Sequence, residues 1–261
     1  MTDVLVLLLV VLSILFLATV FLLRRLRKPK KQKEMIPLPD HLKDHLSQVP
    51  FYNRLSPGQQ KHFESRVQQF LSGVRITGVN TEVTETDRIL VAASAIIPIF
   101  NFDDWEYPNL NEVLLYPSNF NHEFEQEGSE RNIMGMVGNG PMQDIMIISQ
   151  HELRQGFLDQ GGKTNTAIHE FVHLVDKTDG ATDGIPENLI LPSYVEPWLK
   201  LMHRKIMEIH QGDSDINPYG ATNEAEFFAV VSEYFFERPE LLARKHPELF
   251  EMLTKIFQSR K

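Results

Sequence analysis

The chain has 261 residues, of which 42% are hydrophobic and 23% are charged, as expected for a globular protein of one large or two small domains. Its formal net charge is −9, and it has no cysteine, which excludes disulfides, thiolate metal sites and cysteine nucleophiles. Any zinc site in this chain must therefore use histidine and carboxylate ligands.

The first predicted element is a membrane anchor. Residues 4–23 are apolar except for one serine and one threonine, and as a helix they would span about 30 Å, the thickness of a bilayer core. The alternative is a cleaved signal peptide, but that run is too long and no basic residue precedes it. It also ends in Arg24-Arg25 rather than at a small-residue cleavage site. We therefore expect residues 1–23 to be a retained transmembrane helix.

Residues 24–35 are predicted to be a basic juxtamembrane linker that contacts anionic lipid, because seven of them are Arg or Lys. The positive-inside rule places the anchor as a single pass in the inner (cytoplasmic) membrane, with the rest of the chain in the cytoplasm. Subtracting these seven from the 26 basic residues leaves 19 against 35 acidic residues. This acidic balance argues against nucleic acid as a partner.

The remaining residues, 36–261, are predicted to fold as a mainly helical α+β domain with a small sheet beside the central helix. Apolar periodicity indicates helices at residues 41–48, 57–72, 86–97, 196–210 and 223–236. Strands are predicted at 112–116 and 144–149, where β-branched and apolar residues stand between turn residues. Pro197 is expected in the first turn of its helix, where proline is tolerated.

A possible metal-binding motif lies in the middle of this domain. Residues 169–173 read His-Glu-Phe-Val-His, an H-E-x-x-H sequence on a helix for which Asn165 suits the N-cap. Four residues apart, His169 and His173 leave the same helix face about 6 Å from each other and can hold one zinc ion. Glu170, turned by roughly 100° around the helix, can reach a metal-bound water. The alternative is an amphipathic helix with two buried, hydrogen-bonded histidines.

A catalytic zinc needs a third protein ligand and one open position for water. The favoured candidate is Glu226, because the helix around it is mostly apolar and an unpaired carboxylate there would be expensive. Two alternatives remain open. Glu226 has capping-box spacing with Asn223, so its carboxylate could instead bond a backbone N–H. Glu233 shares its helix face and is either a rival ligand or a partner for a histidine.

Peptide hydrolysis is the chemistry that such a site predicts. Zinc lowers the pKa of its water to about 7 and polarises a carbonyl, while Glu170 takes the proton and passes it to the leaving amine. Tyr219, on a predicted turn, could donate to the oxyanion, although a loop tyrosine usually serves packing. Asp176 is either an acceptor beside His173 or an ordinary helix-end acid. A strand such as 144–149 could bind extended peptide by strand addition.

Several segments together resemble one known family over roughly residues 49–250. They are residues 107–108, 113–117, 167–173, 175–176, 179–180, 183–186, 219–222, 224–230 and 232–236. Their sequences resemble the MtfA family of zinc-dependent peptidases. The resemblance implies a gluzincin-type, zincin-like metallopeptidase domain that binds Zn²⁺ through His169, His173 and Glu226. It also implies Glu170 as the catalytic base and Tyr219 as a transition-state donor.

The same resemblance implies an aminopeptidase-type activity on small substrates, and at least one family member binds the glucose-responsive repressor Mlc. The amino-terminal anchor is a departure, since the best-known members are soluble. The leading hypothesis is thus a membrane-anchored cytosolic zinc peptidase that acts on a peptide or protein substrate. The alternative is a regulatory scaffold that keeps the zinc fold and binds a protein partner. A third hypothesis is a zinc hydrolase that acts on a non-peptide bond.

Overall fold

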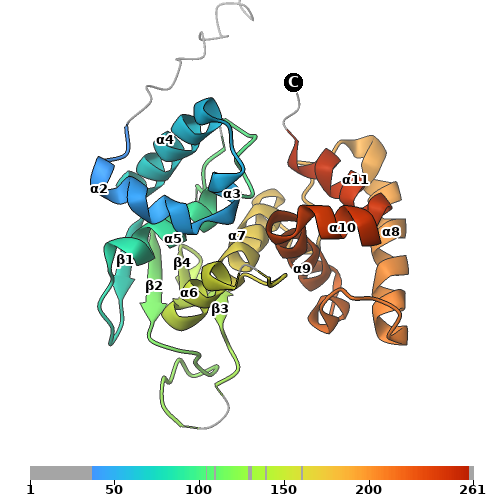
Figure 1. The fold of residues 1–261 in the computed structure, drawn as a ribbon. Coiled ribbons are helices and arrows are strands. Elements are labelled where there is room, and N and C mark those ends of the chain that lie inside the picture. The colour runs from blue at the N-terminus through green and yellow to red at the C-terminus, as the bar shows by residue number, and fades with distance from the viewer. Residues whose placement is uncertain are drawn as a thin grey trace, which may run out of the picture. The chain divides into compact units, whose positions relative to one another are not determined.

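The structure, a computed structural model, describes residues 37–258 except residues 104, 109, 129–130, 139 and 160 (Figure 1). These residues belong to one unit, Ile36–Lys261. The predicted anchor and the basic linker lie outside the described residues, so both stay predictions. Within the part that is described, none of the helices combines the length and the apolar character needed to cross a membrane.

A four-stranded sheet forms one side of the domain, with the strand order β1-β2-β4-β3. The strands are β1 (Arg75–Gly78), β2 (Glu112–Tyr116), β3 (Gly135–Val137) and β4 (Ile145–Ser149). The first three strands in this order run parallel, and β3 pairs antiparallel with β4 at the edge. The predictions for β2 and β4 are confirmed. Strands β1 and β3 were missed because three or four residues are too few to establish an alternating pattern.

The position of β4 corrects one functional expectation. This strand pairs with β2 on one side and with β3 on the other, so its backbone N–H and C=O groups are already engaged. It cannot accept a peptide by strand addition, and the prediction for residues 144–149 was wrong. The edge strands are β1 and β3, and of these β3 lies next to the helix that carries the H-E-x-x-H motif (Figure 1).

The predicted helices are all found, although the one predicted at residues 41–48 is α-helical only over Asp40–Lys43 and continues as a 3₁₀ turn. On the sheet side the helices are α2 (Asp40–Lys43), α3 (Pro50–Asn53), α4 (Pro57–Gly73), α5 (Glu85–Ile96), α6 (Gln150–Leu158) and α7 (Thr166–Asp176). The carboxy-terminal ones are α8 (Pro192–Gln211), α9 (Glu224–Glu237), α10 (Pro239–Lys245) and α11 (Pro247–Phe257). Short 3₁₀ turns are η1 (Asp44–Gln48), η2 (Gly140–Met142), η3 (Lys177–Asp179) and η4 (Pro218–Ala221).

Prolines explain where the predicted helices and the observed ones differ. Pro192, Pro239 and Pro247 each occupy the first position of a helix, where the missing N–H has no partner to lose. In the sequence, Pro239 indicates only the end of a helix, so α10 and α11 were not predicted. Because α8 begins at Pro192, Pro197 lies in its second turn and not in the first turn as predicted.

Helix α7 is the element around which both halves of the domain pack. In Figure 1 it runs between the sheet with α4 and α5 and the carboxy-terminal helices, and it contacts α5, α6, α9 and β3. The side chain of Asn165 caps it by accepting a hydrogen bond from the N–H of Ile168, as predicted. Phe171 is fully buried, with its ring 5.8 Å from that of Phe70 and 5.2 Å from that of Tyr107.

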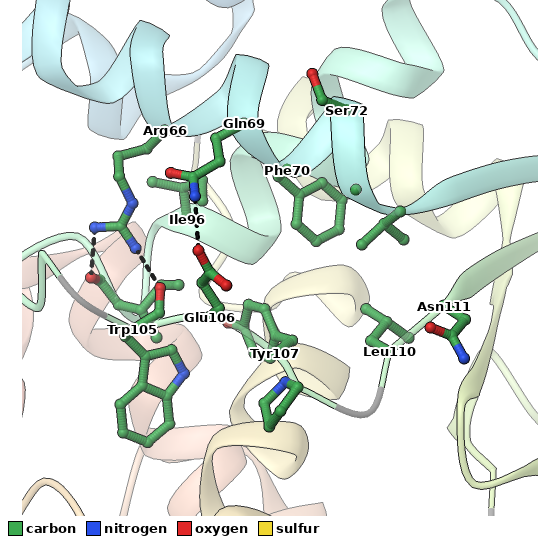
Figure 2. Close-up of a pocket in the computed structure, with 14 residues that line it drawn as sticks. Arg66, Gln69, Phe70, Ser72, Ile96, Trp105, Glu106, Tyr107, Leu110 and Asn111 are labelled. Atoms are coloured by element: carbon green, nitrogen blue, oxygen red, sulfur yellow. Dashed lines mark hydrogen bonds between the residues drawn. The ribbon is translucent and has the colours of Figure 1, made fainter. Parts of the chain in front are cut away.

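A cavity of about 420 Å³ opens between α4 and the segment around Trp105, and Phe70 and Tyr107 lie in its wall (Figure 2). Arg66 donates hydrogen bonds to the carbonyls of Phe102 and Trp105 beside it. No residue of the predicted metal site lines this cavity. The predicted ligands line a different cavity.

Candidate metal centre

The predicted ligands come together on α7 and α9. His169 Nε2 lies 3.0 Å from His173 Nε2 and 2.9 Å from Glu226 Oε2, and His173 Nε2 lies 3.4 Å from the same oxygen. The candidate ligand atoms of all three residues lie within 4.8 Å of one another. Two helices that are distant in sequence thus place two imidazoles and one carboxylate around a single point.

These distances fit one tetrahedral metal ion. A zinc ion bonded to nitrogen and oxygen at about 2.1 Å separates its donor atoms by about 3.4 Å. The three observed separations, 2.9, 3.0 and 3.4 Å, are close to that value. The three donors face a cavity of about 510 Å³, which leaves room for a fourth, non-protein position. Two histidines and a carboxylate with an open position are the donor set of a catalytic zinc site.

Glu226 uses its backbone and its side chain for different purposes. Its N–H donates to the side-chain oxygen of Asn223, which caps α9. Its carboxylate does not close the capping box but faces the two histidines instead. Burial alone would raise the pKa of Glu226, but hydrogen bonds with His169 and His173 hold that pKa well below its usual value. The carboxylate is therefore ionised and available as a ligand.

Glu233 takes the outer position that the sequence left open. Its Oε1 lies 2.7 Å from Nδ1 of His169, on the opposite side of the ring from Glu226, and its Oε2 accepts the backbone N–H of Asn165 at 2.5 Å. One carboxylate thus fixes both the orientation of the His169 ring and the start of α7. Burial lowers the pKa of His169, but Glu233 and Glu226 more than offset this and raise it to about 10.

Glu170 lies in the same cavity and is 6% exposed. Burial is the main reason that its pKa is raised, and the negative charges of Glu226 and Glu233 add to the effect, whereas the neighbouring histidines oppose it. A raised pKa suits a general base, which must take up a proton at neutral pH and later release it.

Tyr219 also lines the cavity, on η4, where Asn217 caps the turn by accepting the Tyr219 N–H. Its side chain is 53% exposed, and its ring centroid lies 6.0 Å from that of His169. Partial burial and the charges of Glu226 and Glu170 raise the pKa of its hydroxyl. The hydroxyl is therefore protonated and able to donate a hydrogen bond into the cavity.

Strand β3 contributes residues to this cavity that the sequence analysis missed. Gly135, Met136 and Val137 line it opposite the ligands. The only local signal was a short apolar stretch between glycines, which the sequence pattern could not place in a sheet. The cavity is thus bounded by an edge strand on one side and by α7, η4 and α9 on the others.

Asp176 has a role that neither sequence interpretation anticipated. It is fully buried, and its Oδ2 accepts the N–H of Gly184, whose carbonyl in turn accepts the indole N–H of Trp198. Its Oδ1 has no hydrogen-bond partner among the described residues. Burial raises the pKa of this carboxyl to about 7. Asp176 therefore holds the turn at Gly184, and it does so at the expense of a buried, half-satisfied carboxyl group.

The comparisons with known proteins agree with this geometry. A buried H-E-x-x-H helix with a carboxylate from a second helix is the site of a metallopeptidase-type domain. Residues 23–258 match the sequence profile of the family described as glucose-regulated metallo-peptidase M90. The chain belongs to this family, which confirms the resemblance to MtfA proteins.

The relatives cover most of the chain. An uncharacterized protein of Synechocystis sp. is 30% identical over 244 residues, which is 87% of each chain. Mlc titration factor A of Escherichia fergusonii is 30% identical over 224 residues, covering 80% of this chain and 82% of that protein. Mlc titration factor A of Klebsiella pneumoniae is 28% identical over 223 residues, covering 80% and 83%.

Replacing Glu233 by glutamine should weaken metal binding, since an amide cannot accept hydrogen bonds from both His169 and Asn165 through two oxygens. We expect the zinc affinity, measured by competition with a chelator, to fall about 10- to 100-fold. Glu240→Gln, at an exposed position on α10, is the matched control and should keep the wild-type affinity. An unchanged affinity in Glu233→Gln would contradict the role assigned to this carboxylate.

Replacing Asp176 by asparagine should change how stability depends on pH. Because the folded pKa of about 7 lies above the ordinary value of 3.8, the unfolded chain loses this proton first as the pH rises. The wild type therefore loses stability relative to Asp176→Asn between about pH 4 and 7, by about 2 to 4 kcal/mol. Urea unfolding in EDTA at several pH values measures this, with the exposed Asp213→Asn as control. Parallel curves for wild type and Asp176→Asn would refute the assignment.

Proposed function

We propose that this protein is a zinc-dependent peptidase. The observation that carries the proposal is the convergence of His169, His173 and Glu226 around one point, with Glu170 in the same cavity. A site that held metal only for structure would have no use for a buried carboxylate beside an open position. Membership of a metallopeptidase family supports the same conclusion.

Each residue has a distinct role in the proposed reaction. His169, His173 and Glu226 would hold zinc, which when bound supplies the Lewis-acid chemistry that activates water toward a peptide carbonyl. Glu170 accepts the proton of the attacking water and delivers it to the leaving amine. The hydroxyl of Tyr219 donates a hydrogen bond to the oxyanion that develops on the carbonyl oxygen.

The edge strand β3 is suited to bind the substrate main chain. Met134 accepts the N–H of Ser149, and Gly138 donates to Ile145, so the residues that alternate with them, Gly135 and Val137, direct their backbone groups away from β4. An extended peptide can pair with these groups.

Two carboxylates that line the same cavity, Asp183 and Glu224, suit the ammonium group of a peptide N-terminus. We therefore propose an aminopeptidase-type activity.

Two variants test the peptidase proposal. Glu170→Gln removes the base but no metal ligand, so it should retain one zinc per chain and lower kcat by about 10² to 10⁴. Glu226→Ala removes a ligand and should lose both zinc and hydrolysis. Metal content and cleavage of a panel of short peptides measure both effects, with Glu240→Gln as control. Full activity in Glu170→Gln would show that another group acts as the base.

A second candidate function is a regulatory scaffold that binds another protein. It is favoured by the relatives named Mlc titration factor A, which align with 80% of this chain. On this alternative the protein binds zinc but hydrolyses none of the peptides in the panel. Binding of a protein partner would then be equal in wild type and Glu170→Gln, because the base has no part in it.

We further propose that residues 1–23 anchor the protein in the cytoplasmic membrane and that the peptidase domain lies in the cytoplasm. The support is the apolar run followed by seven basic residues. Reporter fusions to the carboxy-terminus of the full chain test this orientation. A carboxy-terminal reporter enzyme that works only in the cytoplasm should be active. Activity of a reporter that works only in the periplasm would refute the proposal.

A further inference from the structure

Gly135, the first residue of β3, lies directly against the side chain of Glu170 on α7. A Cβ atom placed on Gly135 would lie 2.6 Å from Cγ, 2.7 Å from Oε1 and 2.9 Å from Cδ of Glu170. Such distances are far inside van der Waals contact, so any side chain at this position must displace the glutamate or the strand.

The backbone conformation does not explain this glycine. Left-handed φ angles occur among the described glycines at Gly128, Gly140, Gly180, Gly184 and Gly212, but not at Gly135. An alanine could adopt the backbone angles of Gly135 without strain. The constraint at this position is therefore one of space, and the space is filled by the carboxylate of Glu170.

The neighbouring strand residues show that the constraint is specific to this position. Side chains of a strand alternate between its faces, so Gly135 and Val137 share one face and Met136 occupies the other. Val137 packs against the main core and Met136 against a second cluster around Phe120, so both positions accommodate a side chain. Of the three residues of β3, only Gly135 lacks room for one.

Of the two partners, the strand is held in place and the side chain of Glu170 is the one that would have to move. Strand β3 is held on both sides of Gly135. Before it, the carbonyl of Met134 accepts the N–H of Ser149. After it, the N–H of Gly138 donates to Ile145, and the carbonyl of Gly138 accepts a hydrogen bond from Lys177. Glu170 belongs to the buried helix α7, so a displaced carboxylate would have to swing into the cavity that the candidate ligands line.

We propose that Gly135 is a positioning residue whose missing side chain creates the space that holds the Glu170 carboxylate against the edge strand. The backbone of Gly135 also points outward for main-chain binding, so the same residue sets the distance between the base and a bound peptide. The catalytic consequence rests on the proposed function, whereas the packing of Gly135 against Glu170 does not.

A double-mutant cycle on stability tests the packing without any assay of activity. Gly135→Ala, Glu170→Ala and the double variant are made in the full chain and unfolded by heat in EDTA. Gly135→Ala should lower the Tm by about 3 to 8 °C when Glu170 is present. In the Glu170→Ala background, where Cγ, Cδ and Oε1 are gone, the same substitution should leave the Tm unchanged. Gly58→Ala, at an exposed position with nothing within 4 Å, is the control.

The kinetic measurement then tests the positioning. Gly135→Ala should keep one zinc per chain and lower kcat by about 10²-fold, because a displacement of the base by about 1 Å has an effect of this size.

An equal loss of Tm in both backgrounds, or no loss in either, would overturn the proposal. If Gly135→Ala does not fold, recovery of folding in the double variant supports the proposal, and failure to recover overturns it. If Gly135→Ala lowers the Tm only when Glu170 is present, but the wild type binds zinc and hydrolyses no peptide, the peptidase function is refuted. The packing of Gly135 against Glu170 is then still supported.

Discussion

The structure depends on the paired burial of charged groups between helices α7 and α9. Taken separately, each helix would bury polar groups without partners in an apolar environment, which is costly. Together they satisfy one another, because Glu226 and Glu233, two turns apart on α9, flank the ring of His169 from opposite sides. Glu233 also accepts the backbone N–H that begins α7, so the geometry of the candidate metal centre and the packing of the two helices are one constraint.

Sequence patterns predicted the parts of the site that lie within one element. The H-E-x-x-H helix and its Asn165 cap could be identified because helical spacing fixes which side chains share a face. Glu226 was favoured as a third ligand because an unpaired carboxylate in a mostly apolar helix would be costly. Glu233 remained open as a rival ligand or as a partner of a histidine, since Glu226 and Glu233 share a face of α9. That choice depends on where α7 docks along α9, which is a tertiary property.

The arrangement of the sheet could not be predicted from the sequence. Strand β4 was recognised, but its place inside the sheet depends on β3, a three-residue strand that returns after a long connection from β2. No local pattern in three residues could reveal an edge strand, and so the sequence indicated β4 for strand addition although β4 has partners on both sides. Gly135 could not have been singled out for the same reason, because its neighbour Glu170 lies far away in sequence and comes close only when β3 packs on α7.

The shortness of β3 has a consequence for selectivity among chains. An exposed strand edge is a template for unwanted pairing with other proteins, and its danger grows with its length. In β3 the outward backbone groups are those of Gly135 and Val137, which can form hydrogen bonds with only a short stretch of another main chain. An edge of this size offers other copies of the protein little to pair with at β3. On the proposed function, it also gives long unfolded chains little advantage over short peptides as substrates.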